Sequence, residues 1–140
     1  MTLAPIQLSP NLKHLLTWEN EQVIERYGRN LGKTREESQS CFVAWKQFMA
    51  VSATRGTGNS VPSGPIDEMW HTALDFTRPY REFCAEYIGR FVDHNPQEHS
   101  DPGGYEATRQ IAEGLFGELD SRYWTADGAC CGIDCCKDGG

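Results

Sequence analysis

The apolar residues of this chain recur every three or four positions along most of its length, and that period indicates α-helices. The clearest case is the segment TREESQSCFVAWKQFMAVSAT, at positions 34–54. Its apolar stripe consists of Cys41, Phe42, Trp45, Phe48 and Met49. Thr34 and Glu37 stand at the spacing of a capping box, which marks a helix start. Strand patterns are nearly absent, so we expect an all-α fold.

The same period predicts further helices on both sides of this segment. We expect them at residues 11–20, 21–31, 66–76, 78–88 and 105–119. Asn20 is the expected cap of the second helix and Gly32 its expected end, with Leu31 on the buried stripe. Thr77 and Pro79 predict a tight corner near residues 76–78, with Thr77 as a cap and Pro79 in a first turn.

Two stretches rich in Gly, Ser, Asn and Pro, at 55–65 and 93–104, are expected to be loops. Residues 1–125 should therefore form a single orthogonal bundle of five or six helices. Residues 126–140 are expected to be a flexible tail, because they are rich in Gly and Cys and carry almost no apolar area.

Charge and hydropathy exclude several functional classes. The net charge is −7, and the chain from residue 95 onward has nine acids against three bases. No basic run is present to contact a phosphate backbone, so we expect no nucleic-acid partner. No apolar run approaches the roughly 18 residues of a membrane span, and the N-terminus lacks a secretory pattern. We therefore expect a cytoplasmic protein that does not bind membranes.

The six cysteines fall into two groups. Cys41 and Cys84 lie within apolar helical patterns, whereas four others crowd the tail: Cys130, Cys131, Cys135 and Cys136. In a cytosolic chain, such a cluster indicates metal or redox chemistry before a disulfide framework. Four thiolates can hold one soft cation, Cu(I) or Zn(II). The alternative is a flexible tail whose cysteines are incidental.

A second group of chemically capable residues lies in PIDEMWHTALDFTRPYREFC, residues 65–84. Asp67, Trp70 and His71 share one helix face, and the carboxylate stands one turn from the imidazole. Tyr80 and Cys84 belong to the facing stripe of the next helix. We expect these five residues to converge across the corner and to form a binding site, with Trp70 largely buried.

This region resembles the glycine-rich domain-containing protein family. The resemblance rests on Asp67, Trp70, His71, Leu74, Tyr80, Cys84, Gly89, His94 and Pro96, together with the Cys- and Gly-rich C-terminus. The sequence departs from the pattern at Ala73, where many members have a second histidine. The resemblance implies a fold and a residue set and supplies no reaction.

Three interpretations of the central residues stay open. His71, Cys84 and His94 could hold zinc, with Asp67 as a fourth ligand or as a group that orients one. They could instead form a helix junction in which Cys84 acts as a small hydrophobe. A Cys–His nucleophile pair is the third interpretation.

The function we predict from the sequence is that of a small non-enzymatic interaction or regulatory protein. Its protein partner and its oligomeric state cannot be identified from the sequence. It would bind a soft metal, Zn or Cu(I), through the tail or through the cluster of His71, Cys84 and His94. The alternative is a metal- or Cys-dependent enzyme with its site at the pair of helices that carry His71 and Cys84.

Overall fold

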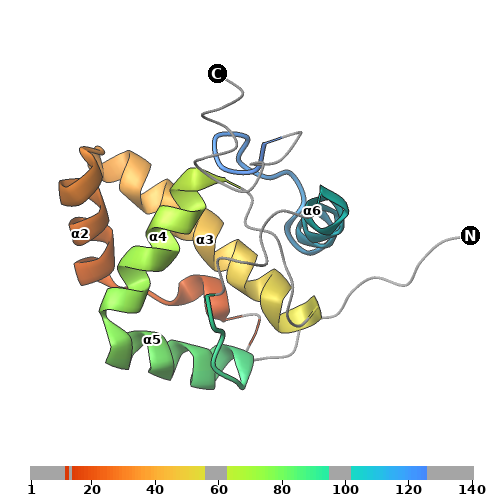
Figure 1. Cartoon of the computed structure of the whole chain (residues 1–140), viewed down its shortest axis with the longest axis horizontal. Helices are drawn as coiled ribbons and strands as arrows, with labels where there is room; N and C mark the ends of the chain where they lie inside the picture. Colours follow the sequence, from red (N-terminus) through yellow and green to blue (C-terminus); the bar gives the residue numbers. More distant parts are fainter. Residues whose placement is uncertain (1–11, 13, 56–62, 95–101, 126–140) are drawn as a thin grey trace, which may run out of the picture.

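The computed structural model describes residue 12 and residues 14–55, 63–94 and 102–125, and within these ranges every regular element is a helix. The elements are η1 (Leu15–Thr17), α2 (Glu21–Leu31), α3 (Arg35–Arg55), α4 (Gly64–Asp75), α5 (Thr77–Phe83), η2 (Cys84–Ile88) and α6 (Pro102–Phe116). Helix α3 runs through the centre and packs against α2, α4 and α6 (Figure 1). The expected all-α bundle is confirmed. Among the described helices, none combines the length and the apolarity that crossing a bilayer requires.

Both ends of α2 and the start of α3 follow the signals in the sequence. The Asn20 side chain accepts a hydrogen bond from the Val23 amide, and Gly32 ends the helix with φ of 67°. The capping box of α3 is also formed. The Glu37 amide donates to Thr34 Oγ1 at 3.1 Å, and the Thr34 amide donates to Glu37 Oε1 at 2.9 Å. These contacts satisfy backbone groups that a helix end leaves without partners.

The centre of the core is aromatic. Trp45 of α3 is fully buried and lies 5.5 Å from Phe83 and 5.7 Å from Phe42 between ring centroids. Trp18 completes the cluster from the segment before α2, with its ring centroid 4.5 Å from that of Phe83. The cluster therefore joins α3 to α5 and to the chain before α2.

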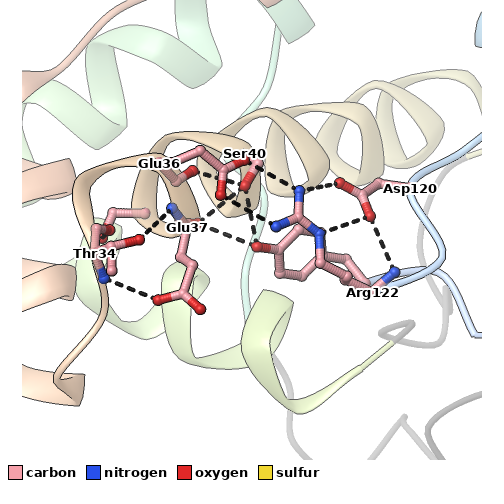
Figure 2. Close-up of polar contacts among 8 residues, drawn as sticks. Thr34, Glu36, Glu37, Ser40, Asp120 and Arg122 are labelled. Atoms are coloured by element: carbon pink, nitrogen blue, oxygen red, sulfur yellow. Dashed lines mark hydrogen bonds and ion pairs between the residues drawn. The ribbon is translucent and has the colours of Figure 1, made fainter.

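The chain after α6 returns to the start of α3 (Figure 2). Arg122 forms ion pairs with Asp120 at 2.8 Å and with Glu36 at 3.3 Å. The Tyr123 hydroxyl donates to the Glu37 carbonyl at 3.1 Å. These contacts hold residues 120–123 against α3, although the exposed ion pairs contribute little individually.

The helix expected at residues 11–20 is wrong in extent: among its described residues, Leu12 is helical and Leu15–Thr17 form the 3-10 helix η1, but residues 18–20 are not helical. Trp18 leaves the helix with an extended backbone, φ −64° and ψ 135°. The buried ammonium of Lys46 donates hydrogen bonds to the Leu16 and Trp18 carbonyls, at 2.7 and 2.8 Å. These tertiary hydrogen bonds replace the ones that a longer helix would have made.

Three smaller expectations also need correction. Helix α4 begins at Gly64 rather than at residue 66, because Ser63 caps it by accepting from the Ile66 amide at 3.5 Å. Leu31 is 37% exposed instead of buried, since it is the last residue of α2, where the chain turns away. The last helix begins at Pro102 and ends at Phe116, earlier at both ends than expected.

The expected corner between α4 and α5 is present, but Thr77 does not have the expected capping role. Phe76 is the residue between the two helices, and Thr77 starts α5 without capping it. The second helix then widens into the single π-helical turn η2 and ends at Gly89, whose φ is 92°. Such a left-handed residue costs glycine little. It reverses the chain, so that residues 91–94 run back toward α4.

Candidate functional site

The chain reversal after η2 places His94 beside two residues of α4, Asp67 and His71. Asp67 and His71 lie one turn apart on that helix, with Asp67 Oδ2 3.7 Å from His71 Nε2. His94 Nε2 lies 2.7 Å from Asp67 Oδ1 and 3.0 Å from His71 Nε2. One ligand atom from each of the three side chains therefore lies within 4.8 Å of the other two.

These atoms compete for a small number of protons. An ionised carboxylate only accepts hydrogen bonds, so the 2.7 Å contact with Asp67 requires a proton on His94 Nε2. His71 Nε2 faces the same nitrogen at 3.0 Å and offers its own lone pair or a second N–H. In both cases, at least one of the three contacts does not pair a hydrogen-bond donor with an acceptor. A cation in place of the shared proton would satisfy a lone pair of all three groups.

The spacing suits a tetrahedral metal ion. Zinc bonds of about 2.0–2.2 Å in that geometry place ligand atoms about 3.3 Å apart. The measured separations of 2.7, 3.0 and 3.7 Å lie on both sides of that value. Small side-chain movements would be enough to form three bonds.

The three side chains differ in exposure, and the difference gives the site an open side. The His94 side chain is 9% exposed, that of Asp67 is 24% exposed, and that of His71 is 56% exposed. An ion bound here would have protein on the His94 side and solvent on the His71 side. Three protein ligands with an open fourth position are typical of catalytic or exchangeable sites, whereas structural zinc sites are closed.

Trp70 and Tyr80 support His94 from inside the protein. Trp70 is 5% exposed, as expected of a core anchor, and its ring stacks on the His94 ring with centroids 4.2 Å apart. Its indole Nε1 donates to the Tyr80 hydroxyl at 2.9 Å. That hydroxyl in turn donates to the Val92 carbonyl at 2.5 Å. The sequence predicted Trp70 and Tyr80 as site residues. In the structure they contact the segment that carries His94.

Cys84 is not one of the three converging ligand atoms. It is fully buried, and burial raises the pKa of its thiol above the ordinary value. Hydrogen bonds with the Val92 backbone and the Tyr80 side chain lower this pKa, but the effect of burial is larger. A raised pKa disfavours the thiolate, which is the form that binds metals and acts as a nucleophile. The structure thus brings together His71 and His94 from the predicted metal set with Asp67, which the sequence offered as a fourth ligand or an orienting group, and leaves Cys84 outside the group.

The four tail cysteines, Cys130, Cys131, Cys135 and Cys136, lie outside the described residues. The sequence also missed the contact between Trp70 and His94, and it missed the Val92 carbonyl that anchors the segment. The signal for Asp67 was present in its spacing from His71. No local pattern identifies Val92, because its role depends on a hydrogen bond to a residue 12 positions earlier.

Comparisons with known proteins change one interpretation. A family model described as UCP032817-like matches residues 14–111, more than half of the chain. The resemblance to the glycine-rich domain-containing protein family is therefore wrong, since the match is to a different family. Searches of curated proteins and of solved structures found no match.

Proposed function

Since the chain belongs to the UCP032817-like family, whose description names no activity, we propose its function from the site alone: it is a metal-binding protein. Asp67, His71 and His94 would hold one divalent transition-metal ion, with zinc as the natural occupant. The observation that carries this proposal is the convergence of their ligand atoms within 4.8 Å. All three residues lie inside the range that the family model matches, whereas the tail lies outside it.

The donor set narrows the choice of ion. Imidazole suits zinc, copper, iron and nickel, and a carboxylate favours harder divalent ions. Cu(I) prefers thiolates, and the described ligand group contains none. Cu(I) or a second Zn(II) at the four tail cysteines stays a separate prediction, based on their composition alone.

The leading role that we propose is regulatory: the ion would set the conformation of the segment that carries His94, and a protein partner would recognise it. No partner is identified. The second candidate is a metal-dependent enzyme, and the 56% exposure of the His71 side chain favours it. An open fourth position could hold a water whose pKa the ion lowers. The buried free thiols of Cys41 and Cys84 fit a reducing compartment, which supports our proposal of a cytoplasmic protein.

The test is zinc titration by calorimetry on the full chain in which the four tail cysteines are replaced by serine. We expect one ion per chain, with binding strongly weakened but still measurable in His94→Gln and in Asp67→Asn. Both substitutions keep the approximate size of the side chain and remove a metal-binding donor.

Matched controls are His14→Gln and Asp75→Asn, which change exposed residues outside the ligand group. Equal zinc binding in all five proteins would overturn the proposal. Tight binding of Ni(II) or Fe(II) with no binding of zinc would retain the site and exclude zinc as its occupant.

A further inference from the structure

The segment that delivers His94 to the site is held at several points along its length. At its start, the Gly89 amide donates to the Cys84 carbonyl at 2.8 Å. The next residue, Arg90, donates from its guanidinium to the Ser52 carbonyl on α3 at 2.6 Å. The Phe91 ring meets the Tyr80 ring edge-on at 5.4 Å. The segment has no regular secondary structure, so these tertiary contacts determine its path.

The central contact is the buried hydrogen bond from the Tyr80 hydroxyl to the Val92 carbonyl. Val92 stands two residues before His94, so fixing its carbonyl fixes the chain that places the imidazole. The Tyr80 hydroxyl is itself oriented, because it accepts from Trp70 Nε1. Tyr80 and Trp70 are both buried, so water does not compete for these bonds.

Trp70 acts on His94 in a second way. Its indole ring stacks on the imidazole at a centroid distance of 4.2 Å and an interplanar angle of 30°. The stacking limits the tilt of the imidazole plane, and the Val92 anchor limits its position along the chain. Between them they direct Nε2 of His94 toward Asp67 and His71.

We infer that Tyr80 is a positioning residue for metal binding: its hydroxyl holds the Val92 carbonyl so that His94 is already placed as a ligand before the ion arrives. This inference rests on the proposed metal site. Groups that orient ligands commonly change metal affinity by about 10- to 100-fold when they are removed. The reason is that a mobile side chain loses conformational entropy when it becomes a ligand, and this cost weakens metal binding.

The direct test is Tyr80→Phe in the full chain with serine at the four tail positions. This change removes one hydroxyl and keeps the ring. We expect the zinc dissociation constant to rise by about tenfold or more. The matched control is Tyr87→Phe, which removes a hydroxyl from η2, where the half-buried ring of Tyr87 contacts Phe83. Zinc affinity in that control should stay within about twofold of the parent.

A double-mutant cycle separates positioning of His94 from a general loss of stability. In a His94→Gln background, Tyr80→Phe should leave the residual zinc affinity of Asp67 and His71 unchanged. Should Tyr80→Phe fail to fold, Arg90→Ala provides the second variant, because Arg90 is exposed and holds the same segment to Ser52. We expect a smaller loss of affinity in the same direction.

The outcomes separate this inference from the metal site itself. No zinc binding by the parent chain would refute the site and the inference together. Zinc binding that is equally tight in the parent and in Tyr80→Phe would refute the inference alone. The inference would also be refuted if Tyr87→Phe lost as much zinc affinity as Tyr80→Phe. The same holds if Tyr80→Phe lowered zinc affinity as strongly in the His94→Gln background as in the parent. Where Tyr80→Phe does not fold, an unchanged zinc affinity in Arg90→Ala would refute it.

Discussion

Lys46 is buried at the centre of the fold and has backbone carbonyls, rather than a carboxylate, as its described hydrogen-bond partners. Its ammonium donates to Leu16 and Trp18 and lies 4.7 Å from the centroid of the Phe42 ring. Lys46→Met keeps the length and the apolar part of the side chain. It leaves two carbonyls without their donor, at about 1–3 kcal/mol each. Removing a buried charge offsets part of that loss, so we expect a net destabilisation of about 3 kcal/mol.

For a chain of 140 residues, that loss corresponds to a decrease in Tm of about 10 °C, at about 3–4 °C per kcal/mol. Urea unfolding followed by tryptophan fluorescence would measure the free energy directly. Lys33→Met is the matched control: Lys33 is exposed, so its replacement should change stability by no more than about 0.5 kcal/mol. A loss below about 1 kcal/mol for Lys46→Met would show that these hydrogen bonds do not hold η1 to α3.

The pH dependence adds a second check on Lys46. Burial lowers the pKa of this lysine below its ordinary value of 10.5. Between the lowered pKa and 10.5, the unfolded chain holds a proton that the folded chain has lost, so the free energy of unfolding rises with pH. The Lys46→Met protein lacks this rise. The stability difference between the two proteins should therefore widen as the pH increases through that window, and a constant difference would contradict it.

Three further predictions follow from the site and its corner. Trp70→Ala should cost about 3–5 kcal/mol in urea unfolding, because the ring is buried; a loss under about 1 kcal/mol would contradict this. Gly89→Ala should lower the free energy of unfolding by about 1–2 kcal/mol through its positive φ alone, since no atom lies near the added Cβ. The control Gly114→Ala, on an exposed helix face, should raise the free energy of unfolding. Saturating zinc should raise the Tm of the chain, because an ion that binds only the folded state stabilises it; an unchanged Tm would contradict binding at the folded site.

The parts of the fold that the sequence predicted are those with local causes. Asn20, Gly32 and the Thr34–Glu37 box act on backbone groups within a few residues, so their spacing alone identified both ends of α2 and the start of α3. The convergence of Asp67 with His71 has the same origin, one helical turn. These features need no knowledge of the remaining chain.

The parts that failed have distant causes. The short η1 depends on Lys46, a residue type that is rarely buried and that the helical period does not mark as a core donor. The sequence named His94 as a ligand but not its geometry, which depends on the π turn, on Gly89 and on the hydrogen bond from Tyr80 to Val92. Cys84 was expected as a ligand because of its residue type, whereas its burial raises the pKa of the thiol and so disfavours the thiolate.

The order of the three ligands along the chain has a consequence for how the protein opens. Asp67 and His71 belong to α4, and His94 follows 23 residues after His71, with α5 and η2 between them. A bound ion would join both ends of that stretch and close it into a ring. Closure reduces the number of arrangements available to the stretch once its helices melt. Amide hydrogen exchange in α5 would then slow on zinc addition, even though no residue of α5 is a ligand.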